Sequence, residues 1–221
     1  MSQERWSAVD DFFNSQLIKE DPVLVSAITN SDAAGLPPHH VAPNQGKLLQ
    51  LLAGTVGAKS ILEIGTLGGC STIWLARAPP TDGRLISLEF DPTCVAVARK
   101  NIIEAWLDAV VEIREGAALD SLPELIDHPA SPFDLIFIDA DKRNNAAYFD
   151  WALQLAHSGS LIIADNVVRD GRVIERDDPD PNILGIRNFI ASVAREKRVT
   201  ATTIQTVGTK GYDGFLVARV N

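Results

Sequence analysis

Oxygen-bearing side chains follow two apolar segments in the second half of the chain. FDLIFID, residues 133–139, ends in Asp139, and SLIIAD, residues 160–165, ends in Asp165 and precedes Asn166. In a doubly wound sheet these segments would be neighbouring strands, so the three side chains would meet at one edge. Two carboxylates and an amide oxygen suit Mg²⁺, with Mn²⁺ or Ca²⁺ as further candidates. We predict a divalent-metal site, the alternative being helix caps or turns, which also favour Asp and Asn.

A lysine lies close to the first of these carboxylates. The segment continues as FDLIFIDADK, which places Asp141 and Lys142 just beyond Asp139. A dication bound nearby would disfavour the ammonium form of Lys142, and a neutral lysine can act as a general base. We predict that Lys142 is catalytic and that Asp141 fills a turn or supports the metal site. The alternative for Lys142 is a solvated surface position.

A glycine-rich turn lies between a predicted strand and a predicted helix in ILEIGTLGGCSTIWLA, residues 61–76. The turn departs from a dinucleotide fingerprint because Leu67 stands where a second glycine is expected after Gly65. Glu63, which we place in the turn region, would repel a pyrophosphate but not the cationic groups of S-adenosylmethionine. Glu89, at the next strand end, can accept hydrogen bonds from two ribose hydroxyls. We predict a nucleoside ligand, the alternative being a turn that only packs helix on strand.

Small residues follow the third predicted strand, in EGAALDSLPEL at 115–125. Ala117 and Ala118 are predicted to line an adenine pocket. The alternative is that these residues are small only because a helix begins there.

Five short apolar runs organise the larger part of the chain. They lie at 60–64, 84–89, 110–113, 133–139 and 160–165. Each is too short for a helix and too continuously apolar for a half-exposed strand, as is typical of buried parallel strands. The segments between and after them have helical character, at 71–78, 92–106, 119–126, 144–156 and 183–197. This βαβ series predicts an α/β fold, a Rossmann-like doubly wound sheet with helices on both faces.

The two ends of the chain extend this plan. Two more strands, at 200–207 and 213–220, are separated by a short turn and are predicted to pair antiparallel. His157 follows the helix predicted at 144–156, where a cation would favour the helix dipole.

The first part of the chain is predicted to be helical. Segments 4–34, with a break at Asp21-Pro22, and 44–56 carry apolar residues at helical spacing. No linker divides the chain, so we predict one domain over 1–221, with an N-terminal helical cap at 1–57 and the Rossmann-like core at 58–221.

Composition excludes some partners and compartments. The net charge of −9 disfavours a nucleic-acid partner, which normally requires a basic patch. Apolar runs stay well short of the roughly 18 residues of a membrane span, and the N-terminus lacks the apolar core of a signal peptide. Two cysteines give no disulfide framework, so we expect a cytoplasmic protein.

Seven motifs, in order along most of the chain, resemble the cation-dependent class I O-methyltransferases, the family of catechol and caffeoyl-CoA O-methyltransferases and their small bacterial relatives. They are VAPNQGKLL (41–49), ILEIGTLGGCSTIWLA (61–76), LISLE (85–89), GAALDSL (116–122), FIDADK (137–142), ADNVV (164–168) and KGYDGFLVA (210–218). FIDADK followed by ADNVV is the most specific of these signals.

The resemblance implies a fold, a methyl donor and a set of site residues. The fold would be a seven-stranded sheet whose last strand inserts antiparallel between two others, with extra N-terminal helices. S-adenosylmethionine would be the donor, and a divalent cation the cofactor. By position, the methionine part of the donor would contact Val41, Glu63, Gly65, Thr66 and Ser71. The ribose would contact Glu89 and the adenine would contact Ala118, while Asp139 would lie close to the amino group of the donor. Asp139, Asp165 and Asn166 would bind the metal, and Lys142 would be the base.

The resemblance also implies the acceptor class. The acceptor would be a small aromatic vicinal diol, such as a catechol, a flavonoid or a hydroxycinnamoyl ester, and the family is commonly homodimeric. His39 and His40 have no fixed pattern in the family, so their roles stay open. The loop at 168–180 varies in the family and is expected to shape the acceptor pocket, and its preference stays open. The alternatives are a methyltransferase acting on another small molecule or on RNA, a nicotinamide-dependent oxidoreductase on a similar sheet, and a non-enzymatic scaffold.

Overall fold

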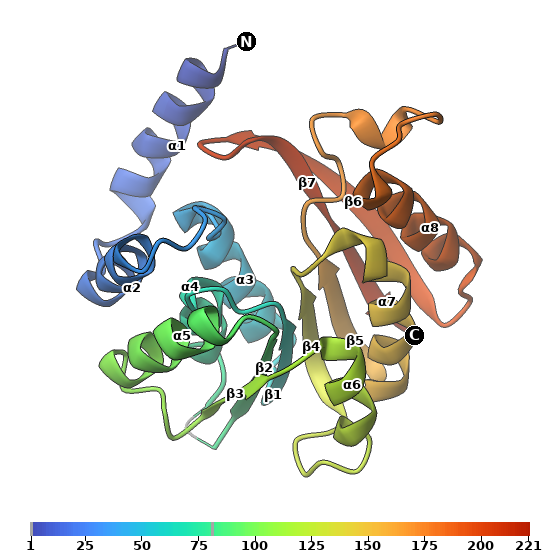
Figure 1. The fold of residues 1–221 in the computed structure, drawn as a ribbon, viewed down its shortest axis with the longest axis horizontal. Helices are drawn as coiled ribbons and strands as arrows, with labels where there is room; N and C mark the ends of the chain where they lie inside the picture. The colour runs from blue at the N-terminus through green and yellow to red at the C-terminus, as the bar shows by residue number, and fades with distance from the viewer. Residues whose placement is uncertain (1, 81) are drawn as a thin grey trace.

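Seven strands form one sheet in the order β3-β2-β1-β4-β5-β7-β6 in the computed structural model, which describes residues 2–80 and 82–221 (Figure 1). The strands are β1 (Ser60–Ile64), β2 (Arg84–Glu89), β3 (Val111–Glu115), β4 (Phe133–Ile138), β5 (Ala156–Ala164), β6 (Val199–Gly208) and β7 (Gly211–Val220). β1 to β5 pair in parallel, whereas β7 runs antiparallel to both of its neighbours. The predicted sheet, including the inserted last strand, is confirmed.

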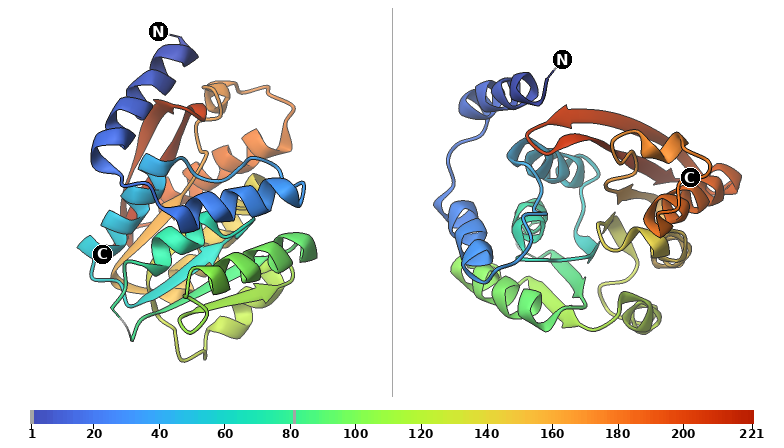
Figure 2. Two further views of the ribbon diagram at one scale, coloured as in Figure 1. Left: turned by 90° about the vertical axis from the view of Figure 1, so that its left-hand side faces the viewer. Right: turned by 45° about the horizontal axis from the view of Figure 1, so that its top comes forward.

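Helices cover both faces of the sheet (Figures 1 and 2). They are α1 (Gln3–Leu17), α2 (Pro22–Ala33), α3 (Pro43–Thr55), α4 (Cys70–Ala76), α5 (Pro92–Glu104), α6 (Ala118–Ser121), α7 (Asn145–Leu155) and α8 (Pro181–Arg195), with 3₁₀ turns η1 (Leu122–Leu125), η2 (Lys142–Asn144) and η3 (Arg172–Ile174). Strand residues alternate between the two cores: Ile61 packs with the α2–α5 side and Leu62 with the α6–α8 side. The continuous apolar runs therefore reflect burial on both faces.

Three helices begin at an Asp-Pro pair. The carboxylates of Asp21, Asp91 and Asp180 each accept hydrogen bonds from main-chain N–H groups in the first turn of α2, α5 and α8. Proline is favoured in the following position because its fixed φ suits the first helical residue and its missing N–H has no partner to lose. Each cap contributes about 1 kcal/mol.

The N-terminal helices pack on the rest of the molecule. Asp10 on α1 accepts hydrogen bonds from Thr209 N at 2.8 Å and Asn44 Nδ2 at 2.9 Å. Gln3 Nε2 donates to Gly208 O at 2.7 Å. Figure 2 shows α1 beside the tip of the β6–β7 hairpin. These hydrogen bonds connect α1, near the start of the chain, to the β6–β7 hairpin near its end.

Two local predictions differ from the structure. β5 begins at Ala156, directly after α7, so His157 is a strand residue, and its Nε2 lies 2.9 Å from Asp134 Oδ1 on β4. The partner of His157 is thus a carboxylate on the neighbouring strand and not a helix dipole. The helix predicted at 119–126 is a single α-turn followed by η1, since Pro123 has no N–H to continue the pattern.

None of the helices in the described part of the chain has both the length and the apolar character needed to cross a bilayer.

Candidate active site

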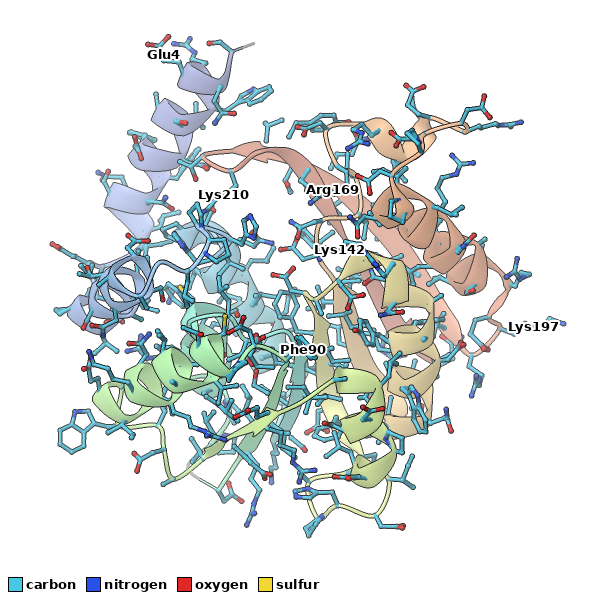
Figure 3. All side chains as sticks on the ribbon, in the orientation of Figure 1. Glu4, Phe90, Lys142, Arg169, Lys197 and Lys210 are labelled. Carbon is cyan, nitrogen blue, oxygen red and sulfur yellow. The ribbon has the colours of Figure 1, made fainter. Side chains whose placement is uncertain are left out.

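The carboxyl ends of β1, β2, β4 and β5 open into a cleft of about 750 Å³. A volume of this order accommodates small ligands. The cleft brings together residues predicted from six separate motifs: Val41, Gly65, Thr66, Ser71, Glu89, Ala118, Asp139, Lys142, Asp165 and Asn166. His39 and His40 also line it, whereas Glu63 and Ala117 do not. Figure 3 labels Phe90 and Lys142, two residues that line this cleft.

The glycine turn after β1 is held by the acid at the end of β2. Glu89 Oε2 accepts hydrogen bonds from Thr66 N at 3.0 Å and Leu67 N at 2.8 Å. Gly65 has φ = 99°, and Leu67 also has a positive φ of 50°. Glycine adopts the first conformation without steric cost. The turn and Glu89 thus form one hydrogen-bonded unit at this edge of the sheet.

Glu63 does not lie in the turn, contrary to our prediction. It is a β1 residue and is fully buried under α4. Its carboxylate accepts hydrogen bonds from the hydroxyls of Ser71 at 2.6 Å, Thr72 at 2.5 Å and Ser87 at 2.6 Å. Burial raises the pKa of Glu63 to about 7, and these three hydroxyls oppose that rise. Glu63 can therefore act on the cleft through Ser71, whose side chain it orients.

Lys142 and Asp139 form an ion pair inside the cleft. Lys142 Nζ donates to Asp139 Oδ1 at 2.9 Å, and only 7% of Lys142 is exposed. η2 begins at Lys142, and α8 packs so closely on it that a Cβ at Gly185 would lie 2.5 Å from Lys142 O. Asp141 accepts hydrogen bonds from Tyr148 and Asn144, which fits the predicted turn role. The lysine is thus held from two sides.

Asp165, at the end of β5, is a buried carboxylate next to a second carboxylate. Gln45 Nε2 donates to Asp165 Oδ2 at 2.6 Å, and Asn166 N donates to Oδ1 at 2.8 Å. Burial and then the negative charge of Asp139 raise the pKa of Asp165 to about 7. Lys142 partly offsets this rise. A buried carboxyl group whose pKa is raised by a neighbouring carboxylate lies in a site that favours a cation.

The donor set at this edge could hold a hard divalent cation. It consists of the carboxylates of Asp139 and Asp165 and the side-chain oxygen of Asn166, all of which line the cleft. Hard oxygen donors suit Mg²⁺, Mn²⁺ or Ca²⁺. Within residues 2–80 and 82–221, no three His, Cys, Asp or Glu side chains are grouped as metal ligands. Two carboxylates and an amide are compatible with that finding.

Three residues that follow β5 have left-handed backbone angles. The φ angles of Asn166, Arg169 and Asp170 are 54°, 54° and 57°. Asp213 Oδ1 on β7 accepts hydrogen bonds from Val168 N at 3.0 Å and Arg169 N at 2.9 Å. One β7 carboxylate therefore fixes the loop that follows β5.

Sequence reasoning missed several residues of the cleft. Gln45, Arg169, Lys210 and Asp213 line it without having been assigned chemistry. Gln45, Lys210 and Asp213 lie in motifs that were noted only for their resemblance to the family. Asp213 could have been found from KGYDGFLVA, because an Asp before a Gly near the start of a strand commonly caps a turn.

Comparisons with known proteins agree on the family. The family described as "O-methyltransferase" matches residues 14–219. A catechol O-methyltransferase of Niastella koreensis is 50% identical over all of both chains. An O-methyltransferase from Bacillus cereus, solved in complex with SAH, is 52% identical over all of both chains with a TM-score of 0.98. TomG of Streptomyces achromogenes, solved with SAM and involved in tomaymycin synthesis, is 48% identical over 100% of this chain and 99% of its own, with a TM-score of 0.97.

These matches cover nearly the whole chain and decide against the nicotinamide-dependent oxidoreductase that we kept as an alternative. The chain belongs to the O-methyltransferase family.

Proposed function

We propose that this chain transfers the methyl group of S-adenosylmethionine to a hydroxyl of a small aromatic vicinal diol and that a divalent cation supports the transfer. The observation that carries the proposal is the Lys142–Asp139 pair, at 2.9 Å, in the cleft that Asp165 and Asn166 also line. A base, two carboxylates and an amide oxygen at one strand-end edge fit acid–base chemistry on a chelating acceptor.

The donor is inferred from the cleft and from two relatives. The B. cereus relative was solved with SAH, and TomG with SAM. In this chain, Val41, Gly65, Thr66 and Ser71 line one part of the cleft and would hold the methionine part of the donor. Glu89 would hold the ribose and Ala118 the adenine, while Asp139 would lie near the amino group. Glu63 would contribute indirectly, by orienting the Ser71 hydroxyl.

The cation would bind to Asp139, Asp165 and Asn166, with Mg²⁺ as the first candidate. The raised pKa of Asp165 beside the carboxylate of Asp139 supports this assignment, because a dication would neutralise the negative charge of the site. When bound, such an ion supplies Lewis acidity that lowers the pKa of a hydroxyl. Gln45 would keep Asp165 oriented through its 2.6 Å hydrogen bond.

Lys142 would accept the proton of the hydroxyl that is methylated. Its Nζ faces the cleft, and its main chain is fixed against Gly185. A buried base that loses little mobility on binding keeps the reacting groups at a productive distance, and such orientation lowers barriers by up to about 7–11 kcal/mol in favourable cases.

The acceptor class follows from the relatives and from the cleft. The N. koreensis relative carries the name catechol O-methyltransferase. A cleft of about 750 Å³ that must also contain the donor leaves space for a small aromatic molecule.

The test uses purified protein, labelled S-adenosylmethionine and catechol. EDTA should abolish methyl transfer, and added Mg²⁺, Mn²⁺ or Ca²⁺ should restore it. Calorimetry in EDTA should still detect SAH binding, since the donor residues are separate from most of the metal ligands. Full methyl transfer in EDTA would contradict the proposed need for a cation. The absence of transfer to catechol under every condition would contradict the proposed acceptor class.

A further inference from the structure

We propose that the acceptor carries a carboxylate in addition to its vicinal hydroxyls and that Arg169 binds this carboxylate. The inference rests on the proposed function and narrows its substrate class.

Three lysine or arginine side chains line the cleft, namely Lys142, Arg169 and Lys210. Figure 3 labels all three around the same opening. Lys142 is paired with Asp139, and Lys210 Nζ donates to Pro38 O at 2.9 Å. The guanidinium of Arg169 forms no hydrogen bond or ion pair with any residue that the structure describes, although the side chain is only partly exposed. Among these three side chains, Arg169 is therefore the one whose charged group has no partner in the part of the chain that the structure describes.

None of the five carboxylates of the cleft binds the guanidinium of Arg169. Each of the five accepts hydrogen bonds from the protein: Glu89 from Thr66 and Leu67, Asp139 from Lys142, Asp141 from Tyr148 and Asn144, Asp165 from Gln45 and Asn166, and Asp213 from Val168, Arg169 and Gly214. Asp213 binds the main chain of Arg169 and leaves its guanidinium free. An anion on the ligand is thus the partner that the site lacks.

His40 does not substitute for Arg169. Burial and the nearby Lys210 lower the pKa of His40 below its ordinary value, so its imidazole is mainly neutral at pH 7. Arginine stays charged at all working pH values and presents a planar set of donors that matches a carboxylate.

The loop around Arg169 is held in a costly conformation. Arg169 and Asp170 both have left-handed φ angles, each of which costs on the order of 1 kcal/mol for a residue other than glycine. Asp213 compensates by binding two successive amides, and a Cβ at Gly214 would lie 2.7 Å from Val168 Cγ2. Strain that is stabilised by surrounding structure is typical of residues that contact ligands. The strain here serves to present one side chain at the cleft.

The charge of the whole protein makes a local cation necessary for such a ligand. The chain carries a net charge of −9, which disfavours the approach of an anion. A guanidinium at the cleft provides the opposite local charge. Neutral catechols have no group that would use it.

The experiment compares matched acceptors that differ only in charge. The pairs are 3,4-dihydroxybenzoate with 3,4-dihydroxybenzamide, and 3,4-dihydroxyphenylacetate with its amide, assayed with saturating donor and Mg²⁺. The readout is the ratio of kcat/KM for the acid to kcat/KM for the amide. We expect this ratio to exceed about ten for at least one pair in the wild type, because a charged hydrogen-bonded partner contributes about one order of magnitude or more.

Two substitutions identify the residue. Arg169→Met should lower the acid-to-amide ratio about tenfold, mainly through KM of the acid, and Arg169→Lys should retain part of the ratio because a point charge remains. Arg176→Met is the matched control, since Arg176 is an exposed residue of the same loop that does not line the cleft. It should leave both the ratio and the activity unchanged. Calorimetry with SAH checks that Arg169→Met has not removed a donor contact.

The outcomes separate the two proposals. If the wild type has equal kcat/KM values for acid and amide, the proposal that the acceptor carries a carboxylate is overturned, whereas the proposed function stands. If the acid-to-amide ratio of Arg169→Met stays within twofold of the wild-type ratio, Arg169 does not bind the carboxylate. A loss of SAH affinity in this variant likewise overturns the proposed role of Arg169 in binding the acceptor. Failure to methylate any diol with any cation overturns the proposed function itself and this inference with it. If Arg169→Met does not fold, the wild-type ratios still test the carboxylate on the acceptor, and the ratio of Arg169→Lys still tests the role of Arg169.

Discussion

Gly65 lies directly against the main chain of Asp139. A Cβ at Gly65 would be 2.3 Å from the carbonyl oxygen of Asp139, and the φ of Gly65 is 99°. The turn after β1 and the end of β4 are therefore packed without space for any side chain between them. The contact joins residues proposed to hold the donor to residues proposed to hold the cation, so a change at one position is expected to move the other.

Gly65→Ala should damage both stability and activity. The substitution adds a backbone clash and a disfavoured φ, which together cost at least about 2 kcal/mol. Urea unfolding should show the loss of stability, and methyl-transfer assays should show a fall in kcat/KM. Gly54→Ala on α3 is the control, because nothing lies within 4 Å of the added Cβ. An active, stable Gly65→Ala enzyme would show that the contact is not tight in solution.

Lys142→Met should lower kcat by a factor of about 10²–10⁴, the usual contribution of a general base. Binding of Mn²⁺, measured by calorimetry, should change far less than turnover. Lys197→Met serves as the control, since Lys197 is exposed at the far edge of the molecule (Figure 3). Loss of cation binding together with turnover would mean that Lys142 has a structural role.

The His157–Asp134 pair should make stability depend on pH. The hydrogen bond to Asp134 raises the pKa of His157. Burial acts to raise the pKa of Asp134. The hydrogen bonds from the main-chain N–H groups of Ser60 and Lys59 and from His157 outweigh burial, so the pKa of Asp134 is lowered. The contribution of His157 is therefore complete below about pH 6.5, its unfolded value, and is lost as pH rises through its higher folded pKa. The contribution of Asp134 is complete above about pH 3.8 and is lost as pH falls through its lower folded pKa.

A double-mutant cycle measures this pair. His157→Gln, Asp134→Asn and the double variant should show a coupling of no more than about 0.5–1 kcal/mol at pH 5.5, because His157 is partly exposed and solvent screens the pair. The coupling should shrink by pH 8.5. A coupling that does not change between the two pH values would exclude an ionic contribution.

Glu63→Gln should become relatively more stable as pH rises. Burial raises the folded pKa of Glu63 to about 7, so the wild type loses stability between its unfolded pKa and about pH 7, as a buried carboxyl group must ionise. A glutamine has no such ionisation. The difference in unfolding free energy between variant and wild type should shift toward the variant by on the order of 2 kcal/mol from pH 5 to pH 8. A pH-independent difference would mean that Glu63 does not titrate in this range.

Local sequence signals determined most of the elements. Continuous apolar runs identified the strands, because a parallel strand is buried on both faces and needs no alternation. Asp-Pro pairs marked helix starts, since the cap and the fixed φ act within a few residues. The cluster of Asp139, Asp165 and Asn166 followed from two strand ends and the usual strand order, and the structure brings all three to one cleft.

Contacts across the fold were decided by tertiary structure alone. Gln45 meets Asp165, and Asp213 meets the loop after β5, only because the β7 insertion and the packing of α3 bring distant segments together. Glu63 was assigned to a turn because sequence spacing cannot tell the last residues of a strand from the loop that follows. The free guanidinium of Arg169 is likewise a property of its surroundings. Sequence fixes which groups the chain carries, whereas their pairing depends on separations in space that no local pattern encodes.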